Sequence, residues 1–264
     1  NQKCRESGWK YIDEWEKFTD RVAYWVDHKN PYVTYHNSYI ESVWNILAET
    51  EKKKLLYKDY KVLPWCPRCG TALSSHELAQ GYQDDKDLSV TAKFKVVGEE
   101  NTYFLAWTTT PWTLPGNVGL AVGEDIDYVK IKKENNILIL AKERLSVVEG
   151  EYEFVEEIKG KDLVGLEYEP LYSYFKNLAP KNVDMKNAYK VHGADFVTTT
   201  DGTGIVHTAV MYGQDDFALG TKVGMPKFHL VKEDGHFLEG MDFLSGRFVK
   251  DEEVAIDIIK DLAH

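Results

Sequence analysis

From Leu88 onward, the sequence consists of short runs of apolar and β-branched residues separated by turn residues, and this pattern restricts the fold more than any other feature. Runs of this length and composition predict β-strands. The expected strands are Ser89–Val97, Thr102–Thr109, Val118–Val122, Tyr128–Lys132, Ile137–Ala141, Tyr152–Ile158, Tyr189–Thr199 and Gly204–Thr208. Helices are expected at Lys142–Val148, at Asp215–Val223 and, with a clear amphipathic pattern, at Lys250–Leu262. The pattern predicts an α+β, β-rich fold with flanking helices.

Residues 1–63 have helical character instead. Aromatic and aliphatic residues recur at helical spacing over Tyr11–Val26. A second helix is expected to start at Asn37 or Ser38, with Glu41 completing a capping box, and to end at the cationic stretch Lys52–Lys54. Packing between these helices is the preferred interpretation of their aromatic side chains.

The segment PWCPRCGTAL, at Pro64–Leu73, has the pattern of a zinc-knuckle turn. Two thiolates at the spacing of Cys66 and Cys69 can bind one Zn²⁺, but a structural zinc site needs four ligands. Cys4 is distant in the sequence, and His76 is a weak candidate for a third ligand. The two cysteines are therefore either half of a zinc ribbon or an empty pair.

A polar stretch at residues 82–89, YQDDKDLS, marks the expected domain boundary. The sequence thus predicts a helical and zinc-ribbon-like flank over residues 1–87, a β-rich domain over residues 88–249 and a C-terminal helix over residues 250–264.

Composition narrows the class of function. The 264 residues are 43% hydrophobic and 28% charged, which is ordinary for a globular protein, and no apolar stretch has the length of a membrane span. No signal-type segment is recognisable, and the three cysteines suggest no disulfide framework, so a cytoplasmic location is expected. A net charge of −11 argues against broad, non-specific nucleic-acid binding, which needs a positive field.

The segment WTTTPWTLPGN, at Trp107–Asn117, is the first candidate for a functional site. Thr108, Thr109 and Thr110 end a strand-like run, and Pro111 prevents further ladder pairing because it lacks an N–H. Hydroxyls at such a strand end can orient a water molecule or hold a ribose. The alternative is structural: ordinary strand threonines followed by a turn. Composition alone favours this simpler interpretation.

The second candidate is TGIVHTAVMYGQDDF, at Thr203–Phe217, which holds His207 and Asp216. A neutral imidazole can form a pocket wall, and a carboxylate can pair with a substrate ammonium group. The alternative for each residue is structural: a packed histidine and a helix-capping aspartate. The sequence has no GxSxG, HExxH or Walker-type motif, so neither a serine hydrolase nor a zincin has support.

Both segments resemble the editing pocket of isoleucyl-tRNA synthetases, and two upstream segments share this resemblance. YIESVW at Tyr39–Trp44 and CPRCGTALSSHELAQGY at Cys66–Tyr82 are similar to the regions around the inserted editing domain of the same enzymes. The motifs follow in the family's order, and the eukaryote-like branch, which some bacteria also carry, fits best. The resemblance covers essentially the whole chain and implies a barrel-like editing domain with its flanks.

The resemblance also implies roles for individual residues. Asp216 matches the carboxylate that holds the α-ammonium group of a misattached amino acid, and Thr108–Thr110 match the threonines around the ester. His207 matches a wall residue that helps to exclude isoleucine, and Asn117 matches a pocket asparagine. Trp107 lies where the family's pocket rim meets the terminal adenosine of the tRNA.

The implied reaction is hydrolysis of the ester in mischarged Val-tRNA(Ile). The expected partners are the valine-carrying 3′ end of tRNA(Ile) and the remainder of the synthetase, with a monomeric chain and no membrane. No cofactor is expected for editing. ATP would be used only by the catalytic domain, whose HIGH-type and KMSKS-type signatures are absent here, and a second CxxC elsewhere in the enzyme would complete the structural zinc site.

The chain departs from the family pattern at Val210, Met211 and Tyr212, where Ala-Pro and a His or Phe are common around these positions. This departure leaves two other functions open. One is a module that binds the tRNA 3′ end with weak or no hydrolysis. The other is a valyl-type editor that removes threonine, against which the absence of an arginine from TTTPW argues.

Overall fold

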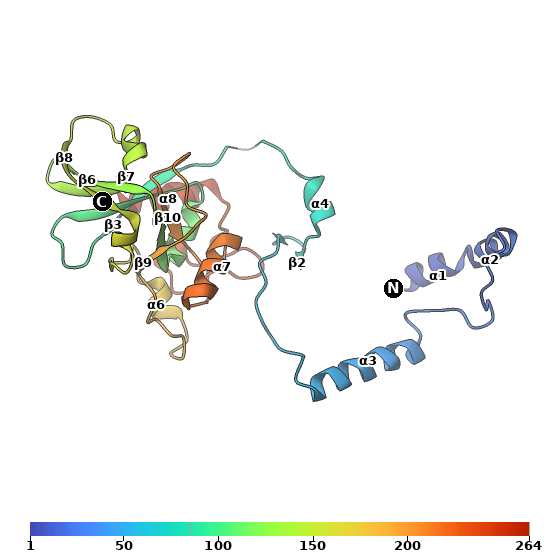
Figure 1. The fold of residues 1–264 in the computed structure, drawn as a ribbon. Coiled ribbons are helices and arrows are strands. Elements are labelled where there is room, and N and C mark those ends of the chain that lie inside the picture. Colours follow the sequence, from blue (N-terminus) through green and yellow to red (C-terminus); the bar gives the residue numbers. More distant parts are fainter. Residues whose placement is uncertain (85, 264) are drawn as a thin grey trace. The chain divides into compact units, whose positions relative to one another are not determined.

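A computed structural model describes residues 1–84 and 86–263 of the chain. Asp85, in the expected polar boundary, and His264, at the end of the expected C-terminal segment, lie outside the described residues. The chain forms two compact units, Asn1–Tyr60 and Lys61–His264 (Figure 1). Each unit is described by itself below.

The N-terminal unit contains the helices α1 (Gln2–Trp9), α2 (Ile12–Arg21) and α3 (Asn37–Lys52). None of these helices has a buried residue, so the expected burial of the aromatic side chains between them is wrong for this structure. The expected capping box at Ser38 is also wrong. The helix α3 already includes Ser38 in its first turn, and its N-cap residue, His36, makes no side-chain cap hydrogen bond.

The second unit begins with the cysteine-containing turn. Strand β1 (Trp65–Cys66) pairs in antiparallel fashion with β2 (Thr71–Ala72), and α4 (Ser75–Ala79) follows. Ser74 and Glu77 form a capping box at the start of α4. The indole Nε1 of Trp65 donates a hydrogen bond of 2.7 Å to the carbonyl of Glu233, which ties this turn to a loop near the C-terminal end of the same unit.

An eight-stranded mixed sheet forms the body of this unit. Its strands are β3 (Val90–Lys95), β4 (Thr102–Thr108), β5 (Gly119–Val122), β6 (Asp127–Lys133), β7 (Asn136–Ala141), β8 (Glu153–Lys159), β9 (Lys190–Gly193) and β10 (Ile205–Thr208). The central strand is β4, which pairs along most of its length with β3, at its start with β7, and near its end with β10. One arm continues from β7 through β6 to β8, and the other from β10 through β5 to β9. The α+β, β-rich class predicted from the sequence is confirmed, whereas a complete zinc ribbon is not seen.

Most strands lie within two residues of their expected bounds, but one prediction is wrong in length. The run Tyr189–Thr199 was expected to be a single strand, whereas β9 ends at Gly193. The carbonyl of Val122 still accepts a hydrogen bond from the N–H of Ala194, and the chain then leaves the sheet as an irregular loop, residues 194–204. Tertiary contacts therefore override the strand preference of this β-branched stretch.

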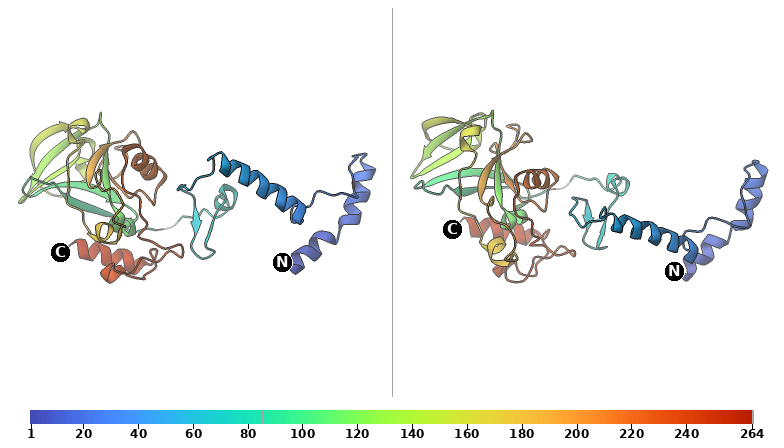
Figure 2. Two further views of the ribbon diagram at one scale, coloured as in Figure 1. Left: turned by 90° about the horizontal axis from the view of Figure 1, so that it is seen from below. Right: turned by 60° about the horizontal axis from the view of Figure 1, so that its bottom comes forward.

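Short helices connect and cover the sheet. They are η1 (Pro111–Gly116), η2 (Lys142–Val147), α5 (Gly160–Leu163), α6 (Tyr174–Leu178), α7 (Gln214–Val223), η3 (Asp242–Leu244) and α8 (Glu252–Leu262). The amphipathic pattern of the last segment is confirmed, because α8 buries Val254 and Ile258. Both views in Figure 2 show α6 and α8 next to η1, which holds the middle of the threonine-rich motif. This packing anchors one side of the site to the core.

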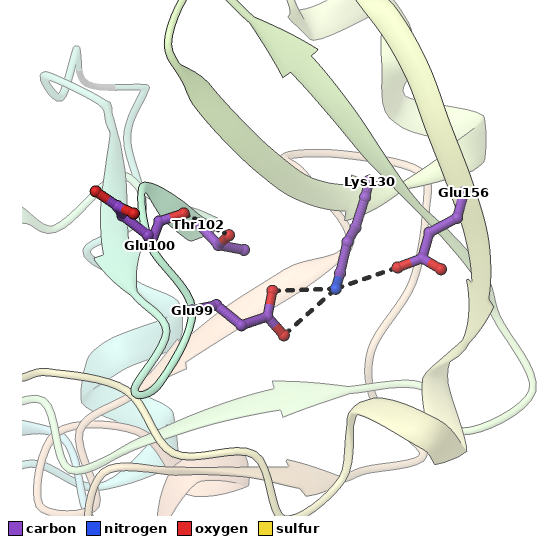
Figure 3. Close-up of polar contacts among 5 residues, drawn as sticks. All are labelled: Glu99, Glu100, Thr102, Lys130 and Glu156. Atoms are coloured by element: carbon purple, nitrogen blue, oxygen red, sulfur yellow. Dashed lines mark hydrogen bonds and ion pairs between the residues drawn. The ribbon is translucent and has the colours of Figure 1, made fainter.

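The sheet packs against two hydrophobic clusters. The larger hydrophobic cluster includes Phe94, Phe104, Leu120 and Tyr168, and a smaller cluster around Ile131 and Leu140 lies in the β6–β7 arm. A half-buried lysine, Lys130 of β6, joins this arm to the turn between β3 and β4. The Nζ of Lys130 lies 3.1 Å from Glu99 Oε2 and 3.1 Å from Glu156 Oε1. Figure 3 shows how the three side chains face one another. Lys130 thus links the β3–β4 turn to the neighbouring strands β6 and β8.

Candidate functional site

The two candidate motifs meet because β4 and β10 are neighbours. Val206 pairs in parallel register with Trp107, so the strand ends that carry the threonines and the histidine lie side by side. Gly204, just before β10, lets the chain pass close to β7: its φ is +74°, and a Cβ there would lie 2.3 Å from the Cβ of Ala141. Strand pairing thus brings together two motifs that lie about a hundred residues apart in the sequence.

A cavity of about 330 Å³ opens at this junction. Of the residues expected in the site, Trp107, Thr108–Thr110, His207 and Asp216 line it, whereas Asn117 lies behind the wall. Further lining residues are Thr113, Phe196, Thr198, Asp201, Gly202, Thr203, Ala209, Tyr212 and Gly213. Both hydroxyl and carboxylate groups face the cavity.

The threonine hydroxyls form a connected group on one side of the cavity. Thr110 Oγ1 lies 3.1 Å from Thr108 Oγ1 and 3.2 Å from Thr113 Oγ1. The backbone N–H of Thr110 donates to Thr108 Oγ1 at 3.1 Å, which fixes the end of β4. Thr108 is buried, Thr110 is half-buried and Thr109 is exposed at the rim. Two of the three hydroxyls are thus held in place at the cavity surface.

His207 is buried, and both of its ring nitrogens face protein groups. Its Nε2 lies 2.8 Å from Thr113 Oγ1, and its Nδ1 lies 3.4 Å from the amide nitrogen of Asn117. Burial lowers the pKa of His207 to about 4, because the charged imidazolium loses its solvation. The ring is therefore neutral near pH 7, and its carbon edge rather than a free nitrogen is available to form a wall.

Asp216 lies in the first turn of α7, where a carboxylate is favoured by the helix dipole. Its Oδ1 accepts a hydrogen bond of 2.9 Å from the N–H of Ala209. Burial raises the pKa of Asp216, and the backbone hydrogen bonds act in the opposite direction. A Cβ on Gly213 would lie 2.1 Å from Asp216 Oδ2, so a larger residue at this position would displace the carboxylate. The group is therefore fixed in place, and a cationic ligand would compensate for its lost solvation.

The irregular loop at residues 194–204 forms another wall of the cavity, through Phe196, Thr198, Asp201 and Gly202. Arg144 of η2 holds this loop: its Nε donates to the carbonyl of Gly202 at 2.8 Å, and its Nη1 donates to the carbonyl of Thr200 at 3.1 Å. No local signal in the sequence marks these residues as part of a site, because the loop has the composition of a strand.

Asn117 does not line the cavity but contacts His207, which does. Its Nδ2 donates to the carbonyl of Gly119 at 2.9 Å, and its Oδ1 accepts a hydrogen bond of 2.5 Å from the hydroxyl of Tyr168. Thr113 and Tyr168 are thus two further residues that the sequence did not indicate. Thr113 at least belongs to the threonine-rich motif, whereas Tyr168 is 51 positions from Asn117 and is part of no motif.

The residues that depart from the family pattern form a closely packed turn. The N–H of Tyr212 donates to the carbonyl of Ala209, and the Tyr212 hydroxyl accepts a hydrogen bond of 2.9 Å from the N–H of Leu230. Val210 is buried, and a Cβ at Gly220 would lie 2.5 Å from it. Since the same turn presents the N–H of Ala209 to Asp216, the departure leaves the carboxylate anchored.

The cysteine turn has the backbone of a metal-binding knuckle. The N–H of Gly70 donates to the carbonyl of Cys66 at 2.9 Å, and Gly70 has a φ of +64°. Hydrogen bonds from the backbone and side chain of Cys69 lower the pKa of the Cys66 thiol, as suits a metal ligand. Within residues 1–84 and 86–263, however, no three His, Cys, Asp or Glu side chains come together as a metal site. The pair fits half of a zinc site, and zinc binding stays a prediction.

Comparison with known proteins identifies the class. The family model of class I tRNA synthetases (I, L, M and V) matches residues 1–252, and the chain belongs to this family. An isoleucine–tRNA ligase of Clostridium acetobutylicum is 53% identical over 94% of this chain, and isoleucine–tRNA ligase 2 of Bacillus cereus is 49% identical over 99%. These alignments cover 23% and 24% of the two relatives, so the chain spans about a quarter of their length.

Two solved structures share weaker similarity. The crystal structure of GlLeuRS-CP1 aligns with a TM-score of 0.43 and 19% identity, over 52% of this chain and 60% of that chain. The editing domain of the cytosolic leucyl-tRNA synthetase of P. knowlesi aligns with a TM-score of 0.40 and 16% identity, over 55% of this chain and 65% of that chain. Among the helices of the described residues, none is both long and apolar enough to cross a membrane.

Proposed function

We propose that this chain is the editing region of an isoleucyl-tRNA synthetase, and that its cavity hydrolyses the aminoacyl ester of Val-tRNA(Ile). The observation that carries the proposal is the convergence of three kinds of groups on one cavity: the carboxylate of Asp216, the hydroxyls of Thr108 and Thr110, and the neutral ring of His207. The high identity to isoleucine–tRNA ligases supports the choice of tRNA.

Asp216 holds the substrate by its amino group. An aminoacyl ester has a free α-ammonium group, and a fixed, partly desolvated carboxylate binds such a cation through charge-assisted hydrogen bonds. Asp216 is suited to this because the N–H of Ala209 fixes its orientation and Gly213 leaves space beside the carboxylate. The ester carbonyl then lies toward the threonine side of the cavity.

A water molecule is the nucleophile. Its oxygen forms a bond with the ester carbonyl carbon, the bond from that carbon to the ribose oxygen breaks, and the ribose oxygen takes up a proton. The products are free valine and uncharged tRNA. Thr108 and Thr110 orient the water, and the free neighbouring hydroxyl of the terminal ribose assists the proton transfer. Positioning of this kind can supply a large part of a rate enhancement.

His207 does not serve as the general base. Its Nε2 faces Thr113 and its Nδ1 faces the amide nitrogen of Asn117, so neither nitrogen is directed at the substrate. With a pKa of about 4 it is also a weak base. It acts as a wall that valine fits and the larger isoleucine does not.

A synthetase needs a second, smaller pocket because isoleucine and valine differ by one methylene, which changes the binding free energy by only about 1–3 kcal/mol. Isoleucyl enzymes are themselves a well-known example of this limit. A synthetic site that accepts isoleucine therefore admits some valine. A hydrolytic site that excludes isoleucine corrects the error without destroying the correct product.

The test is hydrolysis of Val-tRNA(Ile), Ile-tRNA(Ile) and Thr-charged tRNA by this chain and by two variants. Asp216→Asn keeps the shape and can still accept the hydrogen bond from Ala209, but it removes the charge. Because a hydrogen bond to a charged group contributes about 1.5–3 kcal/mol, kcat/KM for Val-tRNA(Ile) should fall about 10- to 100-fold. Asp215→Asn is the matched control, since Asp215 is exposed and is not among the cavity-lining residues.

Each result has a distinct meaning. Selective release of valine, lost in Asp216→Asn and retained in Asp215→Asn, supports the proposal. Undiminished hydrolysis by Asp216→Asn refutes the role of the carboxylate. Binding of the tRNA 3′ end without release of valine, here and in the full-length synthetase, identifies a binding module. Faster release of threonine than of valine identifies a valyl-type editor.

A further inference from the structure

A series of buried hydrogen bonds runs from the core of the second unit to the cavity wall. It starts at the Tyr168 hydroxyl, which donates to Asn117 Oδ1 at 2.5 Å, and continues from Asn117 Nδ2 to His207 Nδ1 at 3.4 Å. His207 Nε2 lies 2.8 Å from Thr113 Oγ1, which donates to the carbonyl of Thr110 at 2.8 Å. All four side chains in the series are at most 7% exposed.

The series has a single consistent direction. The carbonyl of Gly119 can only accept a hydrogen bond, so the group of Asn117 that faces it at 2.9 Å is the NH₂ group. The same NH₂ group faces His207 Nδ1, and two N–H groups directed at each other would repel, so Nδ1 carries no proton. The other amide atom, Oδ1, then accepts from Tyr168. These proton positions follow from the hydrogen-bond network.

The same reasoning places the proton of His207 on Nε2. A neutral imidazole carries one proton, and burial keeps this ring neutral. The Nε2–H donates to Thr113 Oγ1, whose own proton goes to the carbonyl of Thr110. Burial also raises the pKa of Tyr168 well above its ordinary value of 10, so its hydroxyl stays protonated and remains a donor.

We propose that Tyr168 is a positioning residue which, through Asn117, fixes His207 in the Nε2–H form and so sets the shape of the wall that separates valine from isoleucine. Tyr168 does not line the cavity. Its effect on selectivity rests on the proposed function, but its effect on the proton of His207 does not.

Loss of the Tyr168 hydroxyl leaves the buried Oδ1 of Asn117 without its donor. An unsatisfied buried acceptor costs about 1–3 kcal/mol, which weakens the preference for the native orientation of the amide, so that the Gly119 carbonyl alone still favours the NH₂ group at its position. If Oδ1 turns toward His207, the ring proton moves to Nδ1 in order to donate to it. Nε2 then becomes an acceptor, and Thr113 turns its hydroxyl away from the carbonyl of Thr110. The wall and the threonine group therefore shift together.

The experiment compares Tyr168→Phe with Tyr189→Phe. Tyr189 is a matched control because its ring lies 6.2 Å from that of Tyr168, and its buried hydroxyl has no hydrogen-bond partner within the described part of the chain. The ¹⁵N chemical shifts of the His207 ring are measured on histidine-labelled protein without substrate, with His207→Gln used to assign the signals among the eight histidines. Deacylation of Val-tRNA(Ile) and Ile-tRNA(Ile) is measured in parallel.

The native chain and Tyr189→Phe should show a protonated Nε2 and an unprotonated Nδ1. Tyr168→Phe should show a mixture of the two forms, and its preference for valine over isoleucine should fall about tenfold, mainly through kcat. If the valine preference falls with no change in the ring signals, or if neither changes, the proposal is wrong.

Two further results keep the test decisive. A native His207 with its proton on Nδ1 would overturn the proposal even if Tyr168→Phe fails to fold. If Tyr168→Phe fails to fold, Asn117→Asp gives a second test, because a carboxylate only accepts hydrogen bonds and should move the proton of His207 to Nδ1. If no variant hydrolyses Val-tRNA(Ile) but the ring signals change as expected, the proposed function fails while the role of Tyr168 in setting the proton position stands.

Discussion

At the scale of single residues, burial acts on His207 and Asp216 with different results. Loss of solvation favours the neutral form of both groups, lowering the pKa of His207 to about 4 and raising that of Asp216. The N–H of Ala209 supports the charged form of Asp216, whereas His207 has no acidic hydrogen-bond partner among residues 1–84 and 86–263. The site therefore combines a fixed anion with a neutral wall, which suits an ammonium-bearing substrate with an apolar side chain.

The low pKa of His207 predicts a loss of stability in acid. Above pH 6.5 the ring is neutral in both the folded and the unfolded chain. Between pH 6.5 and about 4 the unfolded chain binds a proton that the folded chain does not, so the free energy of unfolding falls as the pH falls. At about 1.4 kcal/mol per pH unit, the total loss is on the order of 3 kcal/mol.

Urea denaturation of the native chain and of His207→Gln, at a series of pH values from 7 to 4, measures this loss. The difference in stability between the two proteins should shift by about 3 kcal/mol over this range. Burial also lowers the pKa values of His192 and His229, but both residues remain in the variant, so their contributions cancel. A pH-independent difference would show that His207 titrates normally.

At the scale of elements, the loop at residues 194–204 shows where sequence patterns reach their limit. Val197 and the threonines after it have the β-branched character of a strand, and the sequence predicts one. The folded chain instead uses Arg144 and Glu143 to hold Thr199, Thr200 and Gly202 away from the sheet. These contacts join segments more than fifty positions apart, and no local pattern reveals them.

Replacing Arg144 should loosen this wall of the cavity. Arg144→Gln removes the donors to the carbonyls of Gly202 and Thr200, so hydrogen exchange over residues 196–203 should accelerate. We expect KM for Val-tRNA(Ile) to rise about tenfold while kcat changes little, because the reacting groups lie on other elements.

The control is Lys142→Gln, which lies in the same short helix but pairs with Glu157 instead of the loop. Equal KM values and equal exchange rates for the two variants would mean that Arg144 does not position the wall.

At the scale of the whole molecule, the sequence predicts the fold class correctly, because the class depends on local strand and turn patterns. The two candidate segments line one cavity, and their role as a site stays a prediction. Their convergence depends on the pairing of β4 with β10, which only the resemblance to synthetases indicated. Tyr168 could not have been found from the sequence, since a buried tyrosine looks like any other core aromatic. The aromatic side chains of the N-terminal unit are a further example: their spacing predicts the helices but not their exposure.

The central claim is that the cavity holds a valyl ester by its ammonium group at Asp216. It is tested most directly by a crystal structure of this chain with a non-hydrolysable analogue of the tRNA 3′ end, in which an amide joins valine to the ribose of adenosine. The account predicts the ammonium nitrogen about 2.7–3.2 Å from the Asp216 carboxylate, with the valine side chain against His207. It also predicts no density for the isoleucyl analogue at the same concentration. A valyl analogue bound outside the cavity, or an isoleucyl analogue bound equally well within it, would contradict the account.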